Sequence, residues 1–185
     1  IGGEGHGTMF MSGGTVDSAV HFALAQDGTG SKGEMTMEGG TIITGSDLKV
    51  GRRGTGTWDM TGGYLDIGSQ LIIAEDAGSS GHMDLHGGLA EALAGDAASP
   101  VDNLIFGEGT GSMDIAYDGK LILGGDEVSR INGFVTDGLI TSLGTNQVTT
   151  MLNGDGNTEV TGIPEPATVA MLGLGGLVLL RRKRS

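Results

Sequence analysis

The chain of 185 residues repeats one short pattern five times, and this repeat limits its possible folds more than any other feature. In each repeat, two apolar residues flank one polar or variable residue, and a Gly-Gly or Asp-Gly pair follows. The first apolar residues of the five repeats, spaced by 23 to 30 residues, are Met9, Met35, Trp58, Met83 and Met113. Self-similarity at such a period is typical of solenoids, in which each repeat forms one coil and stacked coils share a core.

The pattern within each repeat predicts strands. Apolar and polar residues alternate with period two, as expected for a strand that buries one face. Two further short apolar segments follow in each repeat, for example at Ile42 and from Leu48 to Val50. We therefore expect three short strands per repeat, joined at glycine corners, in a right-handed parallel β-helix with about 25 residues per coil. An antiparallel sandwich or roll is the alternative fold.

Stacked coils would bring equivalent residues of successive repeats into internal columns. The five residues named above would form one column. The neighbouring column would contain Met11, Met37, Met60, Leu85 and Ile115. Adjacent coils should lie about 4.8 Å apart. The longest repeat contains the extra segment Glu91–Asp102, which we interpret as an inserted loop.

The repeat pattern ends after Leu123, so we expect the solenoid to occupy residues 1–125. An open solenoid end exposes unpaired backbone and an apolar core, and residues 126–161 are the candidate cap. In this segment INGFVTDGLITSL and NQVTTML predict two or three strands, with a last strand at 159–161. Because the chain begins at Ile1 without an initiator methionine, we expect a fragment or processed form whose missing N-terminal stretch supplied further coils or the opposite cap.

Charge and composition exclude several classes of function. The net charge is −13, and residues 1–162 hold 22 acidic residues against six basic ones. Such a body repels phosphates, so we expect no nucleic-acid partner. Cysteine is absent, which removes disulfides, thiol catalysis and cysteine-ligated metals.

Three aspartates, Asp59, Asp84 and Asp114, occupy the same position in three consecutive repeats. On a solenoid they would form an outward row of carboxylates, which carbohydrate-active β-helices use as acid, base or Ca²⁺ ligands. Because a row of like charges is costly without a cation, weak Ca²⁺ binding is one hypothesis. The alternative is a merely solvated strand face, since Phe10 and Thr36 fill this position in the first two repeats. We expect no other cofactor and no catalytic residues.

Two other sequence features, the segment 153–157 and the four histidines, give weaker indications of a functional site. The segment 153–157 lacks the spaced acidic ligands of a calcium-binding EF-hand loop, so it predicts a turn. We interpret His6, His21, His82 and His86 as surface residues. His82 and His86 are four residues apart, but on a strand this is not the zinc-binding spacing of a helix.

The C-terminal segment has three parts in a fixed order. Pro164, Glu165 and Pro166 come first, an apolar run at 167–180 follows, and the cations Arg181, Arg182, Lys183 and Arg184 come last. As a helix, the apolar run would be about 21 Å long, short of the roughly 30 Å of a hydrocarbon core. The terminal cations are nevertheless typical of a stop-transfer segment whose basic end stays in the cytoplasm. We predict a short C-terminal transmembrane helix within residues 163–185.

This order resembles the PEP-CTERM sorting domain, over about an eighth of the chain. The resemblance implies that Pro164, Glu165 and Pro166 form a motif recognised by exosortase, an integral-membrane cysteine transpeptidase. It also implies export, a transient inner-membrane anchor, cleavage near the motif, and delivery to the cell surface or exopolysaccharide matrix. The repeat body resembles, more loosely, the glycine-rich solenoid segments that often precede such tails.

We therefore expect an exported, non-enzymatic structural or adhesive protein of the cell surface, extracellular matrix or biofilm, with exopolysaccharide as a partner. The alternative is a polysaccharide-degrading lyase or hydrolase on the same β-helix scaffold, which requires acidic and basic residues in one groove. Only Lys49, Arg52 and Arg53 lie near the acidic row in sequence. A cell-envelope anchor without any glycan ligand is a third possibility.

Overall fold

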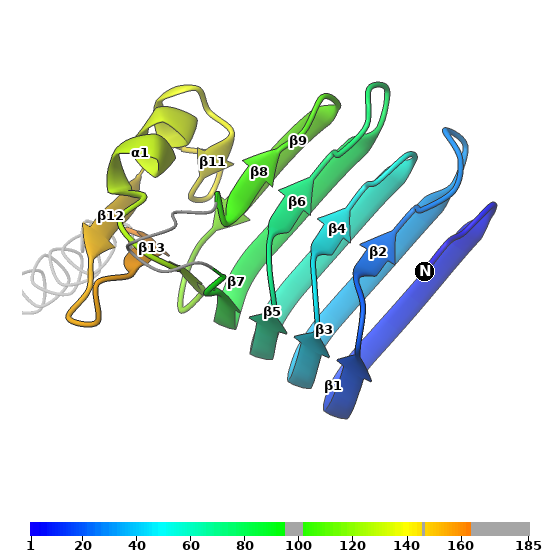
Figure 1. Ribbon diagram of the computed structural model, residues 1–185, viewed down its shortest axis with the longest axis horizontal. Coiled ribbons are helices and arrows are strands. Elements are labelled where there is room, and N and C mark those ends of the chain that lie inside the picture. The colour runs from blue at the N-terminus through cyan, green and yellow to red at the C-terminus, as the bar shows by residue number, and fades with distance from the viewer. Residues whose placement is uncertain (95–101, 146, 164–185) are drawn as a thin grey trace, which may run out of the picture.

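The computed structural model describes residues 1–94, 102–145 and 147–163. In this part the chain forms an all-β solenoid of about five coils, with one helix and three strands at its C-terminal end (Figure 1). The strands of the main sheet within the coils are β1 (His6–Ser18), β3 (Lys32–Thr44), β5 (Thr55–Ile67), β7 (Ser80–Ala92), β9 (Thr110–Ile115) and β10 (Lys120–Leu123). The strands of the second sheet are β2 (Phe22–Leu24), β4 (Leu48–Val50), β6 (Leu71–Ile73) and β8 (Leu104–Phe106).

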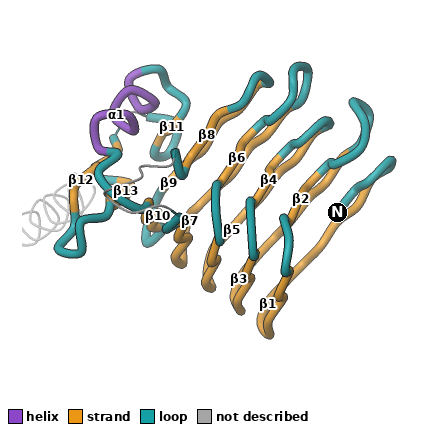
Figure 2. The backbone as a smooth tube through the Cα atoms, in the orientation of Figure 1, coloured by secondary structure: helices purple, strands orange, loops and turns teal. Residues whose placement is uncertain are grey.

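Every described pairing between successive coils is parallel. The long strands pair in the order β1-β3-β5-β7, and β7 then pairs with both β9 and β10. The short strands form the second sheet in the order β2-β4-β6-β8. Figure 2 shows the strands of successive coils lying side by side along the molecule. This arrangement confirms the solenoid and rules out the antiparallel sandwich, while the right-handed sense of the coil stays a prediction.

The two predicted internal columns are confirmed by the strand register. Met9, Met35, Trp58, Met83 and Met113 pair in sequence from β1 to β9, and the column that begins at Met11 follows two residues later. From the second coil onward, each residue of the first column is at most 1% exposed. Their burial in one continuous core supplies the main driving force for stacking, because a single coil has no partner surface for its apolar face.

Each coil contains two strands rather than the three predicted. The first two predicted strands merge into one bent strand of 13 residues in β1, β3, β5 and β7. The bend lies at the Gly-Gly pair, whose second glycine has a φ of 94° at Gly63, for example. The register is displaced by one residue only at the bend, and pairing resumes after it in the original register, so the glycines turn the strand without ending its ladder.

The backbones of neighbouring coils approach closely at this bend. A Cβ atom on Gly63 would lie 2.7 Å from the carbonyl oxygen of Gly40 in the coil below it. It would also lie 2.7 Å from Cε of Met37. Both the left-handed backbone and the lack of space therefore require glycine here.

The loop insertion is shorter than predicted. Glu91 and Ala92 belong to β7, where they pair with Asp66 and Ile67 of the coil before. The insertion therefore begins after Ala92, and its residues 95–101 lie outside the described ranges.

The prediction of strands across INGFVTDGLITSL is partly wrong, because this segment begins within the helix α1 (Val128–Thr136). Ile131 is fully buried, and Phe134 and Val135 pack against the core. These three apolar residues have the i, i+3, i+4 spacing of a helix face. The segment then forms only the short strand β11 (Ile140–Thr141).

The C-terminal elements cover the last coil, where the sequence placed the cap. The strand β13 (Thr158–Gly162) pairs antiparallel with β10, and β12 (Val148–Leu152) pairs antiparallel with β13. At the edge of the second sheet, Arg130 of α1 donates to the carbonyl of Leu104, and the Phe134 ring meets Phe106 edge to face at 5.0 Å. The parallel stacking thus ends on antiparallel strands and a helix. The domain boundary at residues 125/126 stays a prediction.

A buried polar network joins this end to the solenoid. The carboxylate of Glu127, which is 8% exposed, accepts from the backbone N–H and the side-chain amide of Asn103 at 2.9 and 2.8 Å. It also pairs with Arg130. Burial lowers the pKa of Arg130, and the nearby Asp102 opposes this shift. The network satisfies a buried charge that would otherwise be costly.

Among the helices of the described residues, none is long and apolar enough to cross a membrane. The predicted transmembrane helix falls almost wholly on residues 164–185, which lie outside the described part of the chain.

Candidate functional site

The three aspartates of the predicted row do form one register column. Asp59 of β5 pairs with Asp84 of β7, which pairs with Asp114 of β9. Phe10 and Thr36 continue the column through β1 and β3. The three carboxylates are not equivalent, however, because Asp59 is exposed, Asp84 is half-buried and Asp114 is only 8% exposed.

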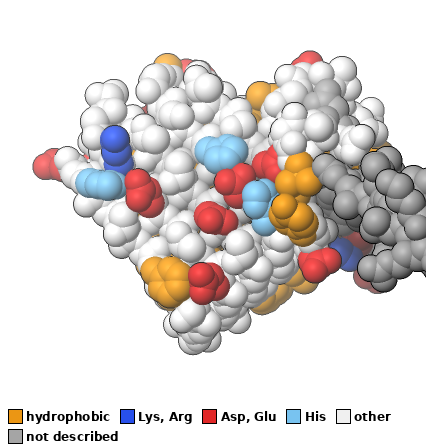
Figure 3. All heavy atoms as spheres, turned by 180° about the vertical axis from the view of Figure 1, so that it is seen from behind, with side chains coloured by type: hydrophobic (Ala, Val, Ile, Leu, Met, Phe, Trp, Pro, Cys, Tyr) orange, Lys and Arg blue, Asp and Glu red, His pale blue; other side chains and the backbone are white. Residues whose placement is uncertain are grey.

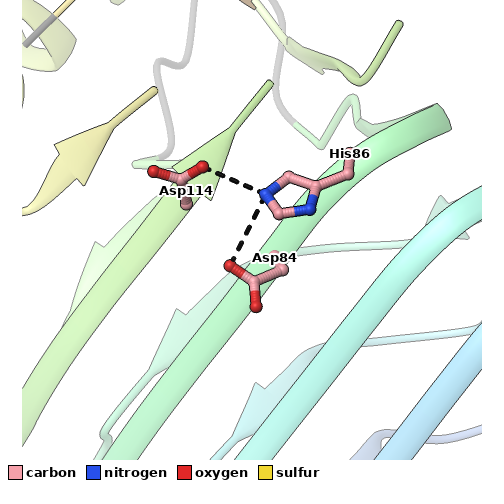
Figure 4. A group of neighbouring side chains, drawn as sticks. All are labelled: Asp84, His86 and Asp114. Carbon is pink, nitrogen blue, oxygen red and sulfur yellow. Dashed lines mark hydrogen bonds and ion pairs between the residues drawn. The ribbon is translucent and has the colours of Figure 1, made fainter. Parts of the chain in front are cut away.

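Two histidines, His82 and His86, lie on either side of Asp84 along the outer face of β7. His82 Nε2 is 3.0 Å from Asp84 Oδ1. His86 Nε2 is 3.0 Å from Asp114 Oδ1 and 3.8 Å from Asp84 Oδ1, so it points between the two carboxylates (Figure 4). Figure 3 shows acidic and histidine side chains gathered on the face of the molecule behind the view of Figure 1. We call His82, Asp84, His86 and Asp114 the His-Asp cluster.

Asp114 is held in place by the turn that follows β11. Its carboxylate accepts from the Thr141 hydroxyl at 2.7 Å and from the backbone N–H groups of Leu143 and Gly144, both at 3.0 Å. Burial raises the pKa of this carboxyl, but the hydrogen bonds from Thr141, Gly144, His86 and Leu143 together hold it below its usual value. Asp114 is therefore an ionised, oriented side chain that also fastens the turn to the last coil.

The two histidine rings have further neighbours. His82 Nδ1 lies 2.8 Å from Ser112 Oγ on β9. The His86 ring meets the ring of Tyr117 edge to face, with centroids 5.7 Å apart. Contacts on the next coil thus restrict both rings.

The cluster has the donor atoms of a metal site. One oxygen from Asp84, one nitrogen from His86 and one oxygen from Asp114 all lie within 4.8 Å of one another. The sequence predicts both histidines on the surface, without a link to the aspartates. The missed signal was the strand alternation itself, because residues 82, 84 and 86 must share one face of β7.

The basic residues named for the enzymatic alternative do not join the acidic row. Lys49 and Arg52 both pair with Glu75, the latter at 3.1 Å, and Arg53 pairs with Asp76 at 3.0 Å. Lys49 belongs to β4 of the second sheet, whereas the aspartate column belongs to the main sheet. No groove with both charges is therefore built from these residues.

The other histidines and the segment 153–157 have simpler roles. His6 lies 3.1 Å from Glu34 in an exposed pair, and His21 lies between β1 and β2. The segment 153–157 forms the turn between β12 and β13. In that turn the side chain of Asn153 accepts from the N–H groups of Asp155 and Asn157. The predicted turn is thus confirmed, with the Asn153 side chain as its centre.

A hydrogen bond between Tyr64 and Glu91 links two adjacent coils on the C-terminal side of the glycine bend. The Tyr64 hydroxyl donates to Glu91 at 2.6 Å, and this hydrogen bond, with burial and the charges of Glu91 and Asp66, raises the pKa of Tyr64 to about 12. The neutral phenol is favoured in the folded state. The contribution of the Tyr64 phenol to the stability of the folded state is therefore complete below about pH 10 and is lost as the pH rises from about 10 to about 12.

We expect the Glu91→Gln variant to lower the pKa of Tyr64 from about 12 toward 10. The chain has two tyrosines, so the measurement uses a Tyr117→Phe background and follows tyrosinate absorbance against pH. An Asp17→Asn variant on β1 is the control and should leave the curve in place. An unshifted curve after the loss of Glu91 would show that this hydrogen bond does not hold the phenol.

Comparison with known proteins gives one match, at the end of the chain. Residues 162–184 match the PEP-CTERM protein-sorting motif. No curated protein and no solved structure matches the chain significantly. The sequence motif Pro164, Glu165 and Pro166 and the basic residues Arg181, Arg182, Lys183 and Arg184 fall in the matched segment, outside the residues whose structure is described. Such motifs are recognised by exosortase and imply export, a C-terminal anchor and cell-surface sorting. The C-terminal segment of this solenoid protein is therefore similar to PEP-CTERM sorting signals.

Proposed function

We propose that this chain is a non-enzymatic structural or adhesive protein of the cell surface or extracellular matrix. The observation that carries the proposal is the sorting motif at residues 162–184, joined to a β-solenoid body. A solenoid presents a long, regular outer face, which suits contact with an extended polymer rather than with a small substrate. The acidic body is suited to divalent cations and to hydroxyl-rich polysaccharide, so exopolysaccharide is the proposed partner.

The site geometry supports a binding role over hydrolysis or elimination. Asp114 accepts hydrogen bonds from three groups of β11 and the turn after it, which leaves it poorly placed to give a proton to a substrate or take one from it. Lys49, Arg52 and Arg53 are paired with carboxylates elsewhere. The polysaccharide lyase or hydrolase alternative thus has no observation in its favour among these residues.

The sorting step is tested at the basic end of the chain. Changing Arg181, Arg182, Lys183 and Arg184 together to glutamine should leave most of the protein unprocessed, because cytoplasmic cations fix the orientation of a terminal segment. The measurement is the ratio of full-length to cleaved chain in membrane and surface fractions of exosortase-containing cells. Arg52→Gln with Arg53→Gln is the control and should be processed normally. Normal cleavage and surface delivery of the tail variant would contradict the sorting proposal.

The binding role is tested with the naturally processed protein. We expect it to be retained on an array of acidic and neutral exopolysaccharides, and to release no reducing ends or unsaturated uronates on prolonged incubation. Product release would support the enzymatic alternative. Absence of binding to every glycan would favour the pure cell-envelope anchor.

A further inference from the structure

We propose that the His-Asp cluster binds one divalent first-row transition metal ion of the zinc type, through Asp84, His86 and Asp114, with solvent completing the coordination of the ion. The proposal concerns the outer face of β7 and β9 and does not depend on the sorting or adhesive function. It also differs from the weak Ca²⁺ binding expected of an aspartate row, because one of the three protein donors is an imidazole.

The separations between donor atoms fit a shared ion. Ligand atoms that each lie about 2.0–2.1 Å from a tetrahedral zinc ion are about 3.3 Å apart. His86 Nε2 lies 3.0 Å from Asp114 Oδ1 and 3.8 Å from Asp84 Oδ1, and the donor atoms of the three residues all lie within 4.8 Å of one another. The 3.8 Å separation is too long for a hydrogen bond, yet it falls near the spacing of two ligands of one ion.

The surrounding contacts orient the donors. Metal-binding side chains in proteins are usually fixed by hydrogen bonds from a second layer of residues. Here Thr141, Leu143 and Gly144 hold the Asp114 carboxylate. His82 Nε2 lies 3.0 Å from Asp84 Oδ1, so this ring can orient the Asp84 carboxylate from outside the group of donor atoms.

The site is also open to solvent on one side. The side chains of His82, Asp84 and His86 are 43%, 31% and 28% exposed, and that of Asp114 is 11% exposed. An ion can therefore reach the cluster without opening the core, while Asp114 provides a rigid, partly desolvated carboxylate beneath it. Partial desolvation strengthens the attraction between the carboxylates and a cation.

The donor set selects a transition metal over calcium. Ca²⁺ prefers six to eight oxygen ligands, whereas imidazole nitrogen suits Zn²⁺, Cu²⁺ and Ni²⁺. The next aspartate of the column, Asp59, is not part of the converging group of donor atoms. One imidazole nitrogen and two carboxylate oxygens are therefore the protein donors that the fold presents to an ion.

The experiment uses the full chain without a histidine tag, in detergent micelles, with Co²⁺ as a spectroscopic probe and Zn²⁺ as its competitor. We expect one Co²⁺ per chain, visible absorption bands of a nitrogen- and oxygen-ligated ion, and displacement by one equivalent of Zn²⁺. His86→Gln should weaken Zn²⁺ binding by at least about tenfold, since even the loss of outer contacts costs about 10- to 100-fold. Asp84→Asn should weaken it similarly.

His6→Gln is the matched control. His6 also lies 3.1 Å from one carboxylate, that of Glu34, and no second carboxylate of the described residues pairs with it. We expect this variant to bind Zn²⁺ as the unaltered chain does, and all variants to keep the same circular dichroism spectrum. Equal Zn²⁺ affinity in His86→Gln and His6→Gln, no bound Co²⁺, or displacement of Co²⁺ by equimolar Ca²⁺ would each overturn the proposal. In the first two cases the cluster is an ion-pair network alone.

Discussion

The Gly63→Ala variant is expected to unfold with a free energy lower by about 2–5 kcal/mol than that of the unaltered chain. The left-handed backbone, with a φ of 94°, contributes about 1–2 kcal/mol of this loss. The close approach of a new Cβ to the Gly40 carbonyl oxygen contributes about 1–3 kcal/mol, because the neighbouring backbone must shift to make room. The measurement is the midpoint of urea unfolding followed by circular dichroism.

Gly78→Ala separates these two contributions. Gly78 has a φ of 81°, but a Cβ atom there meets nothing within 4 Å. This variant should lose only the backbone contribution of about 1–2 kcal/mol. If the two variants were equally stable, the close packing of coils at the glycine bend would not be a constraint on the sequence.

The Asp114→Ala variant is expected to lose about 2–4 kcal/mol of unfolding free energy. Three donors, the Thr141 hydroxyl at the end of β11 and the N–H groups of Leu143 and Gly144 in the turn that follows, would lose their acceptor. Hydrogen bonds to a charged group are worth about 1.5–3 kcal/mol, and the N–H groups of the exposed residues Leu143 and Gly144 recover part of this from water. The turn should detach from the last coil before the core itself unfolds.

Two measurements check this expectation. Urea unfolding reports the stability, and amide hydrogen exchange at Leu143 and Gly144 reports the local release of the turn. Asp59→Ala is the matched control, since it removes an exposed carboxylate from the same column and should change stability by less than about 0.5 kcal/mol. Unchanged exchange at both amides in Asp114→Ala would show that the turn is held by other contacts.

The architecture of the coils could be predicted from the sequence because it follows from the local periodicity of apolar residues. Residues that alternate with period two must share a strand face, and a repeat of about 25 residues places equivalent side chains in register. The column from Met9 to Met113 and the aspartate column therefore follow without any knowledge of distant contacts. The turn at 153–157 follows likewise from its own residue types.

The sequence pattern predicted strands where the helix α1 forms, although the apolar spacing of a helix is a local feature. The apolar face of this nine-residue helix that packs on the core consists only of Ile131, Phe134 and Val135, and the helix also contains Gly133. Glycine lowers helix stability by about 1 kcal/mol relative to alanine. Contact with the edge of the second sheet, through Phe106 and Leu104, supplies the packing that stabilises the helix in this protein.

The five-fold repeat pattern thus determined by itself the coils, their register and the outward-facing strand position of Asp59, Asp84 and Asp114. Only the tertiary structure decided that the Gly-Gly pair bends one strand instead of separating two, and that the three aspartates differ in burial. It also decided that His86 points between two carboxylates of adjacent coils. The physical reason is that periodicity specifies which face a side chain occupies, whereas its partners depend on the backbone of the neighbouring coil and on the turn packed against it.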